Sequence, residues 1–377
     1  MGAWAGKYVI GLTGNIAVGK SVVRKMLEHV GAYGIDADAL AHRAIMKGSP
    51  GYQATIEAFG KWILDEDGQI DRAKLGKVVF ANSGAMAALE EIVHPLVWQA
   101  VDVLARRVKQ RVIVIEAIKL LETDLHTKCD QIWVTQATPQ TQLARLVKKR
   151  KMTPADAQQR IDAQPLATDK LKAANVVITN SGTFEETWNQ VSRAWKSIPK
   201  TSRKAPPAPK PVSPGQVTVE RATPKHADLI ASFITKQSAG ERRMTRSDVM
   251  AAFGEKAFLL LRVGEELVGV LGWQVENLIT RVDDVILTGS ISVAKALNLL
   301  VKTMETASRE LQSEAALLFL TPVIAQHENI WRDLGYKART VKDLKVRAWQ
   351  NAAMESMLPG TVLFFKRLRM HRVLRPM

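Results

Sequence analysis

The sequence contains a single cysteine, Cys129, among its 377 residues. One thiol excludes a disulfide framework and any zinc site built from several cysteines. No apolar run approaches the roughly 20 residues that are needed to cross a bilayer. The first residues, MGAWAGKYVIGLTG, carry no apolar leader with a small-residue cleavage site. We therefore expect a cytoplasmic protein without a membrane segment.

Acidic residues are scarce relative to basic ones. The 53 Lys and Arg residues outnumber the 37 Asp and Glu residues, which gives a formal net charge of +16. The excess is +7 in residues 1–200 and +9 in residues 201–377, so both halves are basic. Such a charge suits nucleic acid, a membrane surface or anionic small molecules. Because no basic stretch is interleaved with aromatics and no nucleic-acid reader motif is present, nucleic acid is the disfavoured partner.

Low complexity is confined to residues 198–216, IPKTSRKAPPAPKPVSPGQ, which hold six prolines and four basic residues. Proline fixes φ and removes a backbone donor, so this stretch suits neither a helix interior nor a central strand. We interpret it as a basic linker between two domains, at 1–197 and 217–377. The length agrees, because domains commonly have about 100–200 residues.

The first half alternates strand-like and helical segments, which is typical of a parallel sheet covered by helices on both faces, an α/β fold. In the second half strands and helices do not alternate in this way, and we expect an α+β fold there. The expected strands lie at 8–13, 112–115, 131–134, 176–178, 217–221, 257–263, 266–274, 316–320 and 360–366, and the expected helices at 19–30, 85–109, 153–163, 224–236, 291–312 and 325–334.

Residues 14–21, GNIAVGKS, fit the pattern G-x-x-x-x-G-K-[ST] between an apolar strand and a helix. Glycine lets the backbone turn tightly, so that its N–H groups form a concave nest for phosphate oxygens. The N-terminus of the following helix adds positive charge. In such a loop Lys20 reaches the β- and γ-phosphates and Ser21 binds Mg²⁺. We predict ATP or GTP binding; the alternative is a glycine-rich turn with a solvated lysine.

The segment 34–38, GIDAD, is interpreted as a short second strand that ends in Asp36 and Asp38. Ligands of open α/β sheets bind beyond the carboxyl ends of the strands, and a carboxylate there can accept the proton of an attacking hydroxyl. Since side chains alternate along a strand, we expect at most one of the two to face the phosphates. A polar strand end or a helix cap is the alternative.

Four strings in one order, GLTGNIAVGKS, IDADALAHRAI, FGKWILDEDGQIDRAKLGKVVFAN and LEEIVHPLVW, resemble dephospho-coenzyme A kinase. The resemblance continues through CDQIWV, QTQLARLVKKRKMTPADAQQRIDAQ and VVITNSGT, and it covers residues 7–195. It implies a P-loop NTPase sheet with a helical substrate domain and a lid. It also implies transfer of the ATP γ-phosphate to the 3′-hydroxyl of dephospho-coenzyme A, the last step of coenzyme A biosynthesis.

The same resemblance implies the roles of individual residues. Asp38 and Lys20 are then catalytic, with Asp38 as the general base, while Ser21 binds Mg²⁺ and Glu116 is a candidate second partner of the ion. An ordinary strand-end carboxylate at Glu116, a solvated Arg72 and a core His94 are the alternatives. The implied ATP-binding residues are Gly14, Ala17, Val18, Gly19, Lys20, Ser21, Val22, Arg145, Arg150 and Asn180, and the implied substrate-binding residues are Asp38, His42, Arg72 and His94.

A basic cluster at 145–160 supports the lid independently. Thr153 before Pro154 predicts the start of the second helix of a helix–turn–helix. A basic lid over ATP neutralises the transferred charge and excludes water, and Arg145 and Arg150 are its best candidates. A solvated basic face is the alternative. The family commonly has glycine where this chain has Asn15 and Ala17, changes that keep the backbone donors.

Residues 217–366 resemble the GNAT N-acetyltransferase fold through VTVERATPKHADLIASFI, LLLRVGEELVGVLGWQ and ENIWRDLGYKAR. An active member binds the acetyl-coenzyme A pyrophosphate with a Q/R-x-x-G-x-G/A loop, but here the corresponding stretch has only Gly289, with Ser290 and Ser292 nearby. We therefore favour a degenerate, regulatory or partner-binding domain over acetyl transfer. Trp273, Trp331 and Trp349 are expected in its core, and the basic cluster from Lys366 onward is interpreted as a solvated tail.

The sequence thus predicts a dephospho-coenzyme A kinase that uses ATP and Mg²⁺, followed by a GNAT-like domain. The alternatives are another small-molecule P-loop kinase, or a bifunctional kinase and N-acetyltransferase that also binds acetyl-coenzyme A or another anionic ligand. A nucleic-acid-binding module driven by basic charge is the rival from another class.

Overall fold

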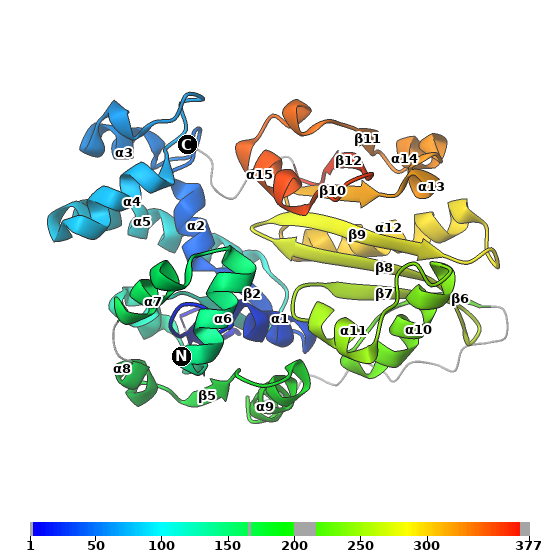
Figure 1. Ribbon diagram of the computed structural model, residues 1–377, viewed down its shortest axis with the longest axis horizontal. Coiled ribbons are helices and arrows are strands. Elements are labelled where there is room, and N and C mark those ends of the chain that lie inside the picture. The colour runs from blue at the N-terminus through cyan, green and yellow to red at the C-terminus, as the bar shows by residue number, and fades with distance from the viewer. Residues whose placement is uncertain (1–2, 165–166, 200–215, 370–377) are drawn as a thin grey trace.

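A computed structural model describes residues 3–164, 167–199 and 216–369. Within these residues the chain forms two sheets, one from each half (Figure 1). None of the helices in this part of the chain is long and apolar enough to cross a membrane. The expected linker at 198–216 lies almost entirely outside the described residues, so the domain boundaries stay predictions.

The first sheet is parallel throughout, with the strand order β2-β3-β1-β4-β5. Every residue of β3 is buried, as expected for an inner strand covered on both faces. The α/β fold predicted for this half is therefore confirmed. Its strands are β1 (Tyr8–Thr13), β2 (Tyr33–Asp36), β3 (Val112–Glu116), β4 (Gln131–Gln136) and β5 (Val176–Thr179).

Helices cover both faces of this sheet. On one face α1 and α9 pack against Ile10 and Leu12 of β1, and on the other α5 packs against Ile113 and Ile115 of β3. Figure 1 places α3 and α4 together, away from the sheet, where a helical substrate domain was predicted. The helices are α1 (Lys20–His29), α2 (Ala37–Ala44), α3 (Tyr52–Phe59), α4 (Arg72–Ala81), α5 (Ser83–Arg107), α6 (Pro139–Arg150), α7 (Pro154–Asp162), α8 (Ala167–Lys172) and α9 (Phe184–Lys196).

The second sheet has seven strands in the order β11-β12-β10-β9-β8-β7-β6, and only β9 and β10 pair in parallel. This mixed sheet is the α+β half that the sequence predicted. Its strands are β6 (Val217–Arg221), β7 (Ala257–Val263), β8 (Glu266–Glu276), β9 (Ile279–Leu287), β10 (Ala315–Leu320), β11 (Lys337–Ala338) and β12 (Val362–Arg367).

One face of the second sheet is covered by α12, and the other by α10, α11 and α15. Trp273, Trp331 and Trp349 are buried in these cores, as expected. The helices are α10 (Ala227–Gln237), α11 (Arg246–Ala252), α12 (Val293–Glu310), α13 (Pro322–Ala325), α14 (Glu328–Asp333) and α15 (Arg347–Ser356).

Several features of this half differ from the expectations: α11, α15, β11 and β9 were not predicted, and Lys366 is placed differently. Strand β9 was not predicted, because Asp283 and Asp284 interrupt its apolar pattern. In the fold Lys256 Nζ lies 2.7 Å from Asp283 Oδ2 and 2.5 Å from Asp284 Oδ2, and Arg242 pairs with Asp284 as a second cation. Lys366 is not part of a solvated tail but belongs to β12. Its ammonium donates to Glu305 Oε1 and to the Leu334 carbonyl, both at 2.7 Å. Residues 370–377 lie outside the described chain.

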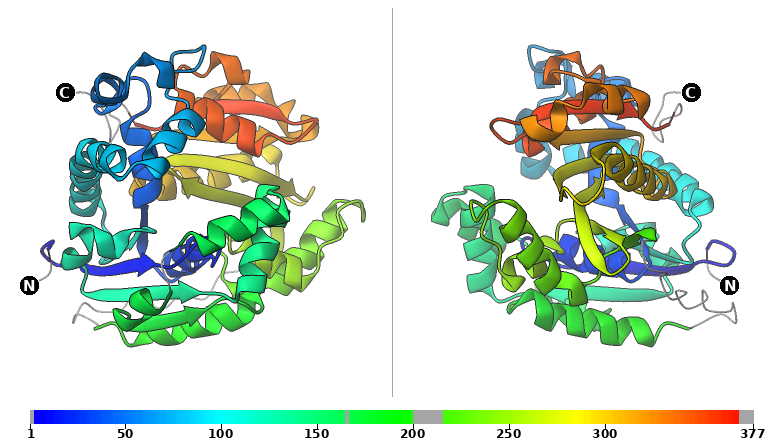
Figure 2. Two further views of the ribbon diagram at one scale, coloured as in Figure 1. Left: turned by 60° about the vertical axis from the view of Figure 1, so that its left-hand side comes forward. Right: turned by 90° about the vertical axis from the view of Figure 1, so that its right-hand side faces the viewer.

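The turn between β8 and β9 joins the two halves. Asn277 and Leu278 both have a left-handed backbone, with φ of 52° and 62°, and Leu278 is buried in the core of the first half beside Tyr33 and Ile35. Next to it, Arg43 of α2 donates to the Asn277 carbonyl and pairs with Glu314 Oε2 at 2.8 Å. The yellow β8–β9 hairpin lies against the blue segment in Figures 1 and 2. The helix that carries Asp38 is therefore anchored to the second half.

Candidate active site

The loop 14–19 turns through three residues of positive φ: Gly14 at 150°, Ala17 at 58° and Gly19 at 90°. A β-carbon on Gly14 would lie 2.2 Å from the Thr135 carbonyl oxygen, and one on Gly19 would lie 2.0 Å from Asn180 Nδ2. Both positions therefore require glycine. Ala17 adopts the left-handed conformation despite its side chain, so the substitution leaves the turn of the loop in place.

Two predicted ATP-binding residues, Asn180 and Arg145, hydrogen-bond to the backbone of this loop. Asn180 is buried, and its Nδ2 donates to the Val18 carbonyl at 2.9 Å. Arg145 of α6 donates to the carbonyls of Ala17 and Val18 at 3.1 Å and to that of Asn180 at 2.8 Å. The helix–turn–helix is confirmed, with the Thr153 side chain capping α7. Arg145 thus fastens the lid to the loop through neutral oxygens.

One cavity of about 2440 Å³ brings most of the predicted site residues together. Gly14 and Val18 are buried residues of the loop and do not line it. Arg160 and Lys170 line it as well, and Lys170 was not predicted. The predicted residues on its wall are Ala17, Gly19, Lys20, Ser21, Val22, Asp38, His42, Arg72, His94, Glu116, Arg145, Arg150 and Asn180.

Four cations of this cavity hydrogen-bond only to neutral groups within the described chain. Lys20 donates to the Asn15 carbonyl at 3.1 Å and Lys170 to the Ile118 carbonyl at 2.8 Å, while Arg72 donates to His42 and Arg145 to the carbonyls above. Among the described residues no carboxylate lies within 4 Å of any of the four. Burial lowers the pKa of both lysines. The cavity therefore presents positive charge that an anionic ligand can neutralise.

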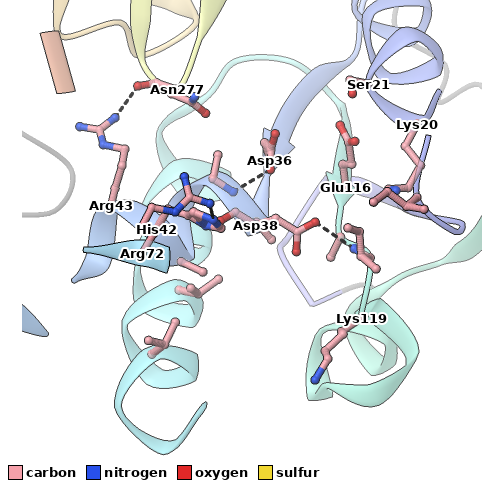
Figure 3. A pocket seen from close by; sticks show the side chains of 18 of the residues that line it. Lys20, Ser21, Asp36, Asp38, His42, Arg43, Arg72, Glu116, Lys119 and Asn277 are labelled. Carbon is pink, nitrogen blue, oxygen red and sulfur yellow. Dashed lines mark hydrogen bonds between the residues drawn. The ribbon is translucent and has the colours of Figure 1, made fainter. Parts of the chain in front are cut away.

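The two aspartates do not lie on opposite sides of a strand, contrary to expectation. Asp36 ends β2, and its Oδ1 accepts the Ala39 N–H at 2.8 Å, so it caps α2. This cap ends the strand two residues earlier than expected and places Asp38 in the first helical turn. As a result both carboxylates line the cavity, as Figure 3 shows.

Asp38 combines partial burial with a fixed orientation. Its Oδ2 accepts the Ile118 N–H at 3.1 Å, and this bond links α2 to the segment that follows β3 (Figure 3). Burial raises the pKa of Asp38 above its usual range, and the neighbouring Asp36 charge adds to the effect. A carboxylate with a raised pKa is a stronger proton acceptor, which is the property that a general base needs.

Glu116 at the end of β3 is already ion-paired. Its Oε2 lies 2.6 Å from Arg24 Nε, and both side chains are buried. Burial raises the pKa of Glu116 although Arg24 opposes the shift. Ser21, Asp36 and Asp38 lie on the same cavity wall. A hydroxyl and several carboxylates form the hard oxygen donor set that suits Mg²⁺.

The predicted acceptor residues form a small network. His42 Nδ1 donates to the Asp38 carbonyl at 2.6 Å, which leaves Nε2 to accept from Arg72. The His42 side chain lines the cavity, and burial among the cavity walls together with the Arg72 charge lowers its pKa to about 4. The ring is therefore neutral near pH 7. His94 on α5 is exposed toward the cavity, which excludes the core-histidine alternative.

The second half shows no phosphate loop at 288–292. Ser292 Oγ accepts the Lys295 N–H at 3.4 Å and caps α12, while Ser290 Oγ donates to Glu266 Oε1 at 3.3 Å. Both serines therefore have structural partners, and neither lines the large cavity.

A parallel sheet whose first strand leads through a phosphate loop into a helix defines a P-loop nucleotide-binding protein, and the comparisons specify which family of this class it belongs to. The family model of dephospho-CoA kinase matches residues 8–186. The enzyme of Geobacter metallireducens is 44% identical over 191 residues, which are 50% of this chain and 95% of that protein. The enzyme of Carboxydothermus hydrogenoformans is 41% identical over 189 residues, 48% of this chain and 90% of that protein. This chain belongs to the dephospho-CoA kinase family.

The second half is similar to a different group of solved structures. An acetyltransferase of the GNAT family from Staphylococcus aureus Mu50 is 11% identical, with a TM-score of 0.32, over 41% of this chain and 100% of that chain.

Proposed function

We propose that the first half of the chain transfers the γ-phosphate of ATP to the 3′-hydroxyl of dephospho-coenzyme A, with Asp38 as the general base. The observation that carries this proposal is the cavity that Asp38 shares with four cations, none of which forms an ion pair with a carboxylate of the described residues. Two polyanionic substrates must meet there, and family membership supports their identity.

In the proposed reaction Asp38 accepts the proton of the ribose hydroxyl while the hydroxyl oxygen bonds to the γ-phosphorus. The bond between that phosphorus and the β,γ-bridging oxygen breaks, and ADP leaves. The loop N–H groups and Lys20 bind the phosphates, and Lys170 and Arg150 add positive charge around them. Arg145 acts by holding the loop, since its donors are engaged by backbone carbonyls.

The proposal includes Mg²⁺, which supplies charge neutralisation between the β- and γ-phosphates when it is bound. Ser21 would hold the ion directly, as in other phosphate loops, with Asp36 or Asp38 as oxygen donors close by. Glu116 is a weaker candidate than the sequence suggested, because Arg24 already occupies its Oε2.

A coupled assay of ADP release tests the function. With ATP and Mg²⁺, we expect turnover with dephospho-coenzyme A and little with other nucleosides, sugars or pantothenate derivatives that offer a hydroxyl. Chelation of the metal should stop the reaction, and fresh Mg²⁺ should restore it. Equal rates with unrelated hydroxyl acceptors would support a different small-molecule kinase instead.

The pH profile is expected to depend on Asp36. Because Asp38 must be deprotonated, kcat/KM falls as the pH drops through its raised pKa and is full above it. Asp36→Asn removes the neighbouring charge but keeps the helix cap, since asparagine caps as well as aspartate. The acid limb of the profile should therefore move to lower pH. An unchanged limb in this variant would assign the titration to another group.

For the second half we propose a GNAT-like domain without acetyl transfer. The strings at 217–366 and the mixed sheet support the fold. The structural roles of Ser290 and Ser292, together with a single glycine in the loop, argue against an acetyl-coenzyme A pyrophosphate site.

A further inference from the structure

The large cavity does not end at the first half. Its wall continues onto the second half, where it includes the β8–β9 turn, the start of β9 and one side of α15. Figure 1 shows α15 facing α2 and α3 across the boundary between the halves. A volume of about 2440 Å³ exceeds the roughly 300–1,000 Å³ of a site for one drug-sized ligand. The second half therefore encloses space that two large substrates can fill.

The cavity side of α15 is polar and regularly spaced. Arg347, Asn351 and Glu355 all line the cavity, and residues four apart share one helix face. Trp349 and Ala353 lie on the opposite side, buried against β10 and β12. Because Trp349 and Ala353 pack on the sheet, the face of α15 that carries Arg347, Asn351 and Glu355 is turned toward the cavity.

On this face of α15, the side chain of Arg347 forms weak interactions. Glu355 is neutralised by Arg281 of β9, whose Nη2 lies 2.9 Å from Glu355 Oε2 and whose Nη1 donates to Ser356 at 3.1 Å. Within the part of the chain that the structure describes, the Arg347 guanidinium has two long hydrogen bonds, both 3.5 Å, to Asp67 of the first half and to Gln350. Its side chain is 37% exposed. The face therefore offers a guanidinium that can reorient toward an anion.

The position of Arg347 favours the acceptor substrate, rather than ATP, as the ligand of this side chain. Asp67, its partner across the boundary, lies in the segment that leads to Arg72, and Arg72 contacts His42 beside Asp38. When the ribose hydroxyl is at Asp38, the diphosphate and pantetheine arm of dephospho-coenzyme A must occupy the remaining cavity. The phosphate loop and lid, where ATP is proposed to bind, lie in the first half.

We propose that the second half forms part of the acceptor site, with Arg347 and Asn351 of α15 binding the diphosphate of dephospho-coenzyme A. This inference rests on the proposed function. It assigns to the appended domain a role in kinase substrate binding that needs no acetyl transfer.

Steady-state kinetics of the full-length chain test this assignment. Arg347→Ala should raise KM for dephospho-coenzyme A by about tenfold, the loss expected for a charged hydrogen bond, without changing kcat or KM for ATP. Arg347→Lys should have a smaller effect and Arg347→Glu a larger one. Arg332→Ala is the matched control, because Arg332 is exposed on α14, donates to Asn329 and does not line the cavity.

Each outcome separates the two proposals. If the unmodified chain turns over dephospho-coenzyme A but the Arg347 series leaves its KM unchanged, the acceptor role of the second half is wrong and the kinase function stands. An equal rise in KM for ATP, or a fall in kcat alone, also overturns the acceptor assignment. Absence of turnover in the unmodified chain contradicts the proposed function itself. Thermal midpoints of all variants exclude misfolding as the cause.

Discussion

Asp38→Asn is expected to lower kcat with dephospho-coenzyme A by about 10²–10⁴-fold, the usual contribution of a general base. The amide cannot accept the ribose proton, but it can still accept the Ile118 N–H and keep its place at the start of α2. ATP binding, measured by calorimetry, should stay near that of the unmodified chain, since the loop and Lys20 are untouched.

Asp124→Asn is the control for this substitution. Asp124 lines the same cavity and is exposed, and we give it no role in the reaction. The control should retain full turnover. If Asp38→Asn also retained it, Asp38 would not be the base, and Asp36 would be the carboxylate to examine.

The second large effect is expected on stability, at the buried pair between Arg43 and Glu314. Both side chains are almost fully buried, and they join α2 to the second half. Arg43→Met leaves the Glu314 carboxylate buried without this cation, which typically lowers the free energy of unfolding by about 3–5 kcal/mol. Denaturant unfolding followed by tryptophan fluorescence measures the loss.

The chain offers a matched pair for comparison. Lys109 and Glu310 also connect the halves, at 3.5 Å, but the Lys109 side chain is 82% exposed. Lys109→Met should therefore lower stability by only about 0–1 kcal/mol. If Lys109→Met and Arg43→Met lowered the free energy of unfolding equally, the buried pair would not hold the halves together. The double variant Arg43→Met with Glu314→Met should recover much of the single loss, because both charges of the buried pair are then removed together.

Arg43 also links stability to catalysis. It lies at the end of the helix whose first turn carries Asp38, so its loss releases the far end of that helix. The anchor comes from the β8–β9 turn, which the sequence did not predict because β9 itself was missed. Asp283 and Asp284 made this strand unrecognisable in the sequence. In the structure their charges are balanced by ion pairs with Lys256 and Arg242.

Local geometry was predicted where the interacting groups are neighbours in the chain. The loop 14–21 is such a case, since consecutive residues form the nest and their spacing alone defines it. Thr153 as a helix cap was predicted for the same reason. Asp38 lines the cavity, but the sequence pattern placed it at the end of a strand. Its place in a helix depends on Asp36, which caps that helix, and a helix cap had been one of the alternatives.

The sequence by itself determined the basic, cysteine-poor composition, the two fold classes, the phosphate loop and the acidic residues beyond the second strand. All of these depend on residue types and on short spacings. Only the tertiary structure decided that Lys170 enters the cavity, that Arg145 grips the loop and that the second half closes one side of the site. The physical reason is sequence distance: Arg43 and Glu314 are 271 residues apart, and no local pattern can encode which of many buried charges will meet when two sheets pack together.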